Sequence, residues 1–147
     1  MKENPRRKVS ILAHPMGLLA IPAIGIFGAL MTPKDVSFGE LRMALFASLA
    51  VGLLTIVIVK LELRKCRNAW AEFYITPYME RYTWRMLKLM LLFELTIIVG
   101  MLAASEVAHR LNAPEELGLS VVCILCILAY PEQKAIYETA KAKLREV

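Results

Sequence analysis

Apolar stretches long enough to cross a membrane alternate with blocks of basic residues along this chain. All but three of its 18 Lys and Arg residues fall in residues 1–10, 60–88 and 131–147. The intervening stretches are rich in Leu, Ile, Val and Ala, and 58% of the 147 residues are hydrophobic. A soluble chain of this size leaves too much of its surface in water to hide so many apolar side chains. The pattern therefore predicts a polytopic membrane protein.

The lengths of the apolar stretches predict an all-α membrane fold with four transmembrane helices. A helix needs about 20 apolar residues to cross the hydrocarbon core of a bilayer. We expect residues 1–147 to form one membrane domain, with crossings near residues 11–31, 43–63, 88–108 and 114–130. The fourth stretch is short. It is therefore expected to thin the bilayer locally, to lie beside a partner, or to continue past Pro131.

The basic blocks flank the apolar stretches on one side of the membrane. Only Lys34, Arg42 and Arg110 fall on the other side. The positive-inside rule then places both termini in the cytoplasm, or in the matrix of an organelle, for a protein of a plasma, inner or organellar inner membrane. A model with three crossings and a peripheral fourth segment places the basic tail outside and fits the charges less well. Since the charges follow the ends of apolar segments, we expect anionic lipid headgroups as their counterpart, and no nucleic acid.

The stretch between the second and third crossings is basic and aromatic, and we expect it to be an amphipathic segment on the cytoplasmic side. Trp and Tyr favour the headgroup region because each joins an apolar ring to a polar tip. The expected interfacial residues are Trp70, Tyr74, Tyr78, Tyr82 and Trp84. Soluble partners are expected to contact this segment, residues 64–85, or a helical C-terminal tail at residues 131–147.

Small residues mark the helix-packing faces of the first two crossings. They are Gly25, Gly28 and Ala29 in the first crossing, and Ala44, Ser48 and Gly52 in the second. Small side chains at helical spacing let backbones approach closely in lipid, where hydrophobicity does not drive helix association. The first crossing, kinked at Pro22, is the expected partner of the second. Oligomer formation through such faces is the alternative.

Glu94 is the ionisable residue that stands out within the third crossing. It lies about 9 Å beyond Lys88 at helical rise, among leucines and isoleucines. A charge within the hydrocarbon core costs about 2.5–3.5 kcal/mol on insertion scales. We therefore expect Glu94 to pair with a cation, to extend towards the cytoplasmic interface, or to take part in ion or proton movement.

Cys123 and Cys126 form a Cys-x-x-Cys pair within the fourth crossing. In a four-helix membrane protein such a pair resembles the vitamin K epoxide reductases and the disulfide-forming quinone reductases, which implies membrane thiol oxidoreduction. The resemblance covers four residues. Those families relay electrons through further cysteines in an external loop, whereas the third cysteine here, Cys66, falls in the cytoplasmic segment. Two small packing residues are the simpler interpretation.

The sequence predicts no cofactor and no metal site. His14 and His109 fall at opposite membrane faces, so one haem cannot take both as ligands. Three functional hypotheses follow. The first is a non-catalytic structural or accessory subunit of an energy-converting, secretion or transport complex, or of a homo-oligomer. The second is a small homo-oligomeric channel or transporter that uses Glu94, and the third is a thiol oxidoreductase that uses Cys123 and Cys126. An enzyme is the less favoured class.

Overall fold

The computed structural model of the chain describes residues 9–10, 13–31, 37–77, 80 and 83–146. The elements within those ranges are all helices. In chain order they are the short 3-10 helix η2 (Pro15–Leu19), α1 (Ala20–Leu30), α2 (Phe38–Lys65), α3 (Arg67–Ile75), α4 (Trp84–Arg110), α5 (Glu115–Leu125), a second 3-10 helix η4 (Cys126–Ala129) and α6 (Tyr130–Glu146).

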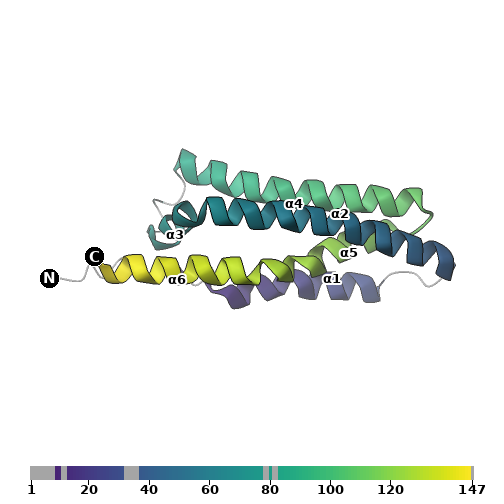
Figure 1. Cartoon of the computed structure of the whole chain (residues 1–147), viewed down its shortest axis with the longest axis horizontal. Coiled ribbons are helices and arrows are strands. Elements are labelled where there is room, and N and C mark those ends of the chain that lie inside the picture. Colours follow the sequence, from purple (N-terminus) through teal and green to yellow (C-terminus); the bar gives the residue numbers. More distant parts are fainter. Residues whose placement is uncertain (1–8, 11–12, 32–36, 78–79, 81–82, 147) are drawn as a thin grey trace.

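The long helices run side by side in an elongated bundle (Figure 1). Among the described residues, three helices are long and apolar enough to cross a membrane: Phe38–Lys65, Trp84–Arg110 and the continuous Glu115–Glu146. The first apolar segment forms a shorter helix, Pro15–Leu30. The small helix α3 lies at one end of the bundle, which we call the α3 end. The protein is therefore an all-helical chain with the composition of a membrane protein.

The helix α5 lies in the middle of the bundle and packs against α1, α2 and α4. Its glycine Gly118 lies so close to α4 that a Cβ atom there would meet the backbone of Ala104 and, at 2.6 Å, the amide nitrogen of Ser105. On the α1 side, a Cβ at Gly25 would meet Cys123 Cβ at 2.8 Å. Small side chains thus let α4 and α1 approach α5 at backbone distance, whereas Gly52 of α2 makes room for the Leu125 side chain.

The predicted packing residues lie largely within these contacts. Ala44, Ser48 and Gly52 are buried along one face of α2. That face packs on α4 and α5 instead of on the first apolar segment, since Ala44 lies in a core cluster with Ala108 and Leu117. In α1, Gly25 is buried and Gly28 faces the Ser120 hydroxyl, whereas Ala29 is exposed. The chain therefore uses most of its small-residue faces internally.

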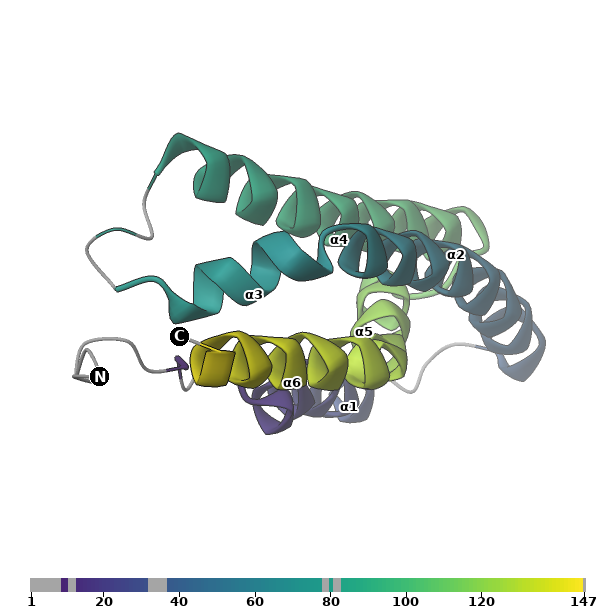
Figure 2. The ribbon, with the colours of Figure 1, turned by 60° about the vertical axis from the view of Figure 1, so that its left-hand side comes forward.

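The helix of the fourth apolar stretch continues past Pro131 into the C-terminal tail. Proline lacks the amide that would donate to the carbonyl four residues earlier, and the chain tightens into η4 just before it. Figure 2 shows α5 turned away from the axis of α6, with η4 at the change of direction. The stretch is thus central rather than peripheral, and its bend carries α6 to the α3 end.

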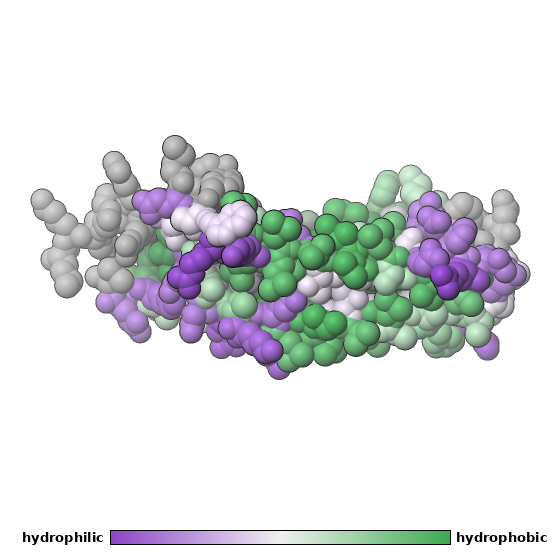
Figure 3. Space-filling view, turned by 90° about the horizontal axis from the view of Figure 1, so that it is seen from above, coloured by the Kyte–Doolittle hydropathy of each residue, from purple (hydrophilic) through white to green (hydrophobic). Residues whose placement is uncertain are grey.

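An apolar band lies between charged groups at the two ends of the bundle (Figure 3). On α2 the band covers the uncharged residues 43–59, which span about 26 Å at 1.5 Å per residue. The end opposite α3 carries an ion pair from Arg110 to Glu106 at 2.9 Å, and His109 Nδ1 lies 3.3 Å from Glu115 Oε1. The thickness of the band is close to that of a hydrocarbon core, about 30 Å.

A Gly118→Ala substitution tests the close contact between α5 and α4. The added methyl group meets backbone, which cannot move aside as a side chain does, so we expect a loss of stability of about 1–3 kcal/mol. Heating the detergent-solubilised protein and following the reactivity of its buried thiols measures the loss. Gly39→Ala is the matched control, because nothing lies within 4 Å of a Cβ there. An unchanged unfolding temperature for Gly118→Ala would contradict the packing described.

Candidate functional site

A buried ion pair joins α2 to the start of α6 at the α3 end of the bundle. Glu132 Oε1 lies 3.0 Å from Arg64 Nη2 and 3.6 Å from Lys60 Nζ, and it accepts a hydrogen bond of 3.1 Å from Arg64 Nε. The Glu132 side chain is 6% exposed. Its other oxygen, Oε2, is buried and has no hydrogen-bond partner within the part of the chain that the structure describes. Two cations therefore share one carboxylate, which leaves a formal charge of +1 on the group.

Two further polar contacts lie beside this ion pair. The Thr96 hydroxyl of α4 lies 3.0 and 3.2 Å from the two carboxylate oxygens of Glu62. Gln133 Nε2 donates to the carbonyl of Ala13 at 3.2 Å and to the Tyr74 hydroxyl at 3.3 Å. Together with the ion pair they form what we call the polar belt: Lys60, Glu62, Arg64, Thr96, Glu132 and Gln133. The belt ties α2, α4, α6 and the segment before η2 together at one level.

A pocket of about 160 Å³ opens beside the polar belt. Aromatic side chains of Trp70, Tyr74 and Phe93 line it, together with the polar groups of His14 and Gln133. His14 Nδ1 accepts a hydrogen bond from the Met16 amide at 3.2 Å, so in the neutral ring the proton is on Nε2. The pocket is smaller than the usual range for drug-sized ligands, about 300–1,000 Å³.

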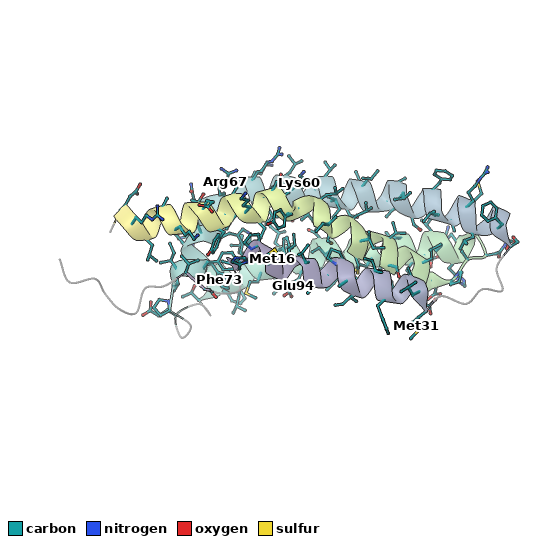
Figure 4. The ribbon with its side chains drawn as sticks, turned by 90° about the horizontal axis from the view of Figure 1, so that it is seen from below. Met16, Met31, Lys60, Arg67, Phe73 and Glu94 are labelled. Atoms are coloured by element: carbon teal, nitrogen blue, oxygen red, sulfur yellow. The ribbon has the colours of Figure 1, made fainter. Side chains whose placement is uncertain are left out.

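Glu94 lies at the level of the polar belt, on the exposed side of α4. The antiparallel pairing of Thr96 with Glu62 places Glu94, two residues closer to the start of α4, near the level of Arg64. Figure 4 places Glu94 close to the level of Lys60 along the bundle axis. The side chain is exposed, and the described residues provide it with no ion pair. It thus lies at the edge of the apolar band and outside the bundle interior.

The expected interfacial aromatic residues divide into two groups. Trp70 and Tyr74 of α3 are 7% and 9% exposed, and they pack in a protein core with Phe73, Leu63 and Ile136. Trp84 at the start of α4 is 72% exposed and has Lys88 Nζ 5.4 Å from its ring centre.

The remaining two expected aromatic residues, Tyr78 and Tyr82, lie outside the described residues. The aromatic segment therefore contributes an internal core between α3 and α6 as well as an exposed ring. An ion pair of 3.5 Å between Lys143 and Glu72 joins the same two helices.

The three cysteines are free thiols in two different settings. Cys123 and Cys126 are buried in the middle of the bundle, and Cys66 is half-buried at the junction of α2 and α3. Cys123 fills the space left by Gly25, which is a packing role. Among the described residues, no three His, Cys, Asp or Glu side chains are grouped so that they could hold a metal ion.

Sequence reasoning missed the polar belt, and above all Glu132. A local signal was present, because Lys60 and Arg64 are four residues apart and so share one face at the end of an apolar helix. Glu132 and Gln133 follow Pro131 directly. The sequence analysis left an extension of the fourth helix past Pro131 open, but it did not predict that this extension brings Glu132 and Gln133 beside α2.

Comparisons with family models, with curated proteins and with solved structures found no match for this chain. The function must therefore be inferred from the bundle itself.

A Glu132→Gln substitution tests the ion pair at the polar belt. It removes the shared carboxylate, but both cations keep some contact with water, so we expect the protein to lose about 1–3 kcal/mol, the range for hydrogen bonds to charged groups. The measurement is the unfolding temperature in detergent. Glu138→Gln, an exposed acidic residue on the same helix, is the control and should leave this temperature unchanged. Equal effects of the two substitutions would mean that the pair does not stabilise the fold.

Proposed function

We propose that this chain is a non-catalytic integral membrane subunit with a structural or accessory role in a larger membrane assembly or homo-oligomer. The proposed assembly is an energy-converting, secretion or transport complex, as in the first hypothesis from the sequence. The main support is a bundle interior closed by small-residue contacts, combined with an exposed acidic residue, Glu94, at the edge of an apolar helix face. Such a face offers a membrane partner both apolar contact and a charge to pair.

The interior of the bundle offers little to a transported ion. The Thr55 and Ser120 hydroxyls are buried within the apolar band, and each donates to a carbonyl four residues earlier on its own helix, at 2.9 and 2.7 Å. These hydroxyls keep lone pairs, and the buried Ser48 hydroxyl has no hydrogen-bond partner among the described residues, but no carboxylate or basic side chain is buried beside them within the apolar band. The lack of buried charge favours the accessory role over an ion path through the interior of one chain. If the protein is a channel, its ion path runs between copies of the chain, on the surface that carries Glu94.

The outer face of α4 is the surface we propose for contact within the membrane. The helix buries only small residues of its apolar part, Gly100, Ala104 and Ala108, and exposes Leu95 and Leu102. Glu94 lies at the edge of this face without a cation from the described residues. A basic side chain of a partner, or of a second copy, satisfies it at lower cost than lipid does.

The orientation we propose has four crossings, with both termini on the cytoplasmic or matrix side. The Ser10 amide donates to the Tyr74 carbonyl at 2.9 Å, so the chain before η2 lies at the α3 end together with the basic residues of α2 and α6. From Pro15 to Leu30, five residues of 3-10 helix and eleven of α-helix span about 26 Å. This length matches that of the apolar band on α2. The match supports η2–α1 as a crossing in addition to the three longer helices.

Substitution of Glu94 tests the assembly. We expect mild detergent to release a particle with more than one chain, and Glu94→Gln to weaken its association about tenfold, which corresponds to ~1.4 kcal/mol. The mass of the particle by light scattering at decreasing concentration gives the result. Glu106→Gln, on the same helix but paired with Arg110, should leave the mass unchanged.

Two outcomes would contradict the proposal. One is a wild-type particle that contains a single chain under every mild condition. The other is a loss of proton flux in vesicles with Glu94→Gln while assembly is intact, which would favour the channel hypothesis.

Labelling of cysteines tests the orientation. In a chain with Cys123→Ala and Cys126→Ala, we expect Cys66 to react with a membrane-impermeant maleimide only after the membrane is permeabilised. A Gly39→Cys variant that also carries Cys66→Ala should react in sealed cells, because Gly39 lies at the opposite end of α2. Ser10→Cys should behave like Cys66 if η2–α1 crosses. Reaction of Ser10→Cys in sealed cells would leave the chain with three crossings.

A further inference from the structure

A shallow groove of about 590 Å³ lies on the outer surface of the bundle, across the bend between α5 and α6. It is open along one side and almost entirely apolar. Its lining comes from η2, from the bend, and from one residue of α2: Met16, Leu19, Ile127, Leu128, Tyr130, Pro131 and Lys60. In Figure 4, Met16 and Lys60 lie on opposite sides of the ribbon that joins η4 to α6.

The groove ends at the cations of the polar belt. Along the chain its lining runs from Ile127 and Leu128 to Pro131, and Glu132 follows next with its two basic partners. The side chains of Lys60 and Arg64 are 30% and 59% exposed, so both keep surface that a ligand can contact. The apolar groove is thus followed by two basic side chains, in the order in which a lipid at a membrane interface would meet them.

Glu132 holds the two cations at this position. Without it, Lys60 and Arg64 would extend freely into water, as long basic side chains near helix ends do. A single carboxylate oxygen receives both, which leaves most of the three donors of Lys and the five of Arg unused. The unused donors of the two cations fit the oxygens of a phosphate diester, because the other carboxylate of the polar belt, Glu62, contacts Thr96 of α4 and not these cations.

We propose that this groove binds an anionic phospholipid, with one acyl chain along η2 and η4 and the phosphate on Lys60 and Arg64. The apolar lining accepts a hydrocarbon chain and not a soluble anion, and the cations select the headgroup. The inference requires that the chain lies in a membrane, but it does not require the proposed assembly. It also does not involve Glu94, which lies on α4.

Lipid titration followed by native mass spectrometry of the detergent-purified chain tests the site. We expect phosphatidylglycerol to bind more tightly than phosphatidylcholine with the same acyl chains. Lys60→Gln with Arg64→Gln should reduce this preference by about fivefold for each cation, the strength of a basic residue near an anionic membrane surface. Lys65→Gln with Arg67→Gln removes the same charge from exposed neighbours that do not line the groove, and should leave the preference intact.

Two further arms keep the test decisive. If the double variant unfolds, a triple variant that adds Glu132→Gln removes the buried counter-ion as well, and should fold but lose the preference. Soluble glycerol 3-phosphate should not displace the lipid, because it lacks an acyl chain. The proposal is overturned if the preference survives loss of Lys60 and Arg64, if the control pair abolishes it equally, or if glycerol 3-phosphate competes as well as the lipid.

Discussion

The close approach of α5 to its three neighbours is the contact on which the rest of the bundle depends. In lipid, helices gain little from apolar surface alone, so association relies on contact between closely spaced backbones. Gly118 against α4, and Gly25 against Cys123, provide that contact from opposite sides of α5. Once α5 is central, α1 has a surface to pack on although its helix is the shortest of the apolar ones. Among the described residues, the side chains buried in the middle of the bundle are uncharged.

Exclusion of charge from the middle explains why the polar side chains gather at the ends. Pro131 supports this arrangement, because the bend before it directs α6 along α2 and brings Glu132 to Lys60 and Arg64. A buried carboxylate between two basic residues contributes less to stability than to position, since desolvation offsets much of the attraction. Its consequence is that the charges of α2 and α6 are held at a fixed level along the bundle, which favours a fixed position in a bilayer.

The sequence predicted the helical class and apolar stretches long enough to cross a membrane, because each is a property of a local pattern. It did not predict contacts between distant segments. Ala44, Ser48 and Gly52 are buried on α4 and α5, whereas the first apolar segment was the expected partner. The aromatic residues Trp70 and Tyr74 matched an interfacial pattern, yet the return of α6 buries them. Glu132 was assigned to a helical C-terminal tail on the cytoplasmic side, with no contact to α2 predicted for it. Each difference arises where the pairing of helices, and not their composition, decides the outcome.

The depth of Glu94 depends on the same pairing. Counted from Lys88 along its own helix, Glu94 lies within the hydrocarbon core. Measured against α2, to which Thr96 is bonded, it lies at the level of Arg64 and therefore at the edge of the apolar band. The two depths differ because α4 begins outside the apolar band. Its first turns, which include Lys88, lie at the level of α3. The free-energy cost of a carboxylate is far lower at this edge than at the bilayer centre. Here the carboxylate can also contact lipid headgroups or a cation of a partner. Glu94 thus lies on the surface of the bundle and not in its interior.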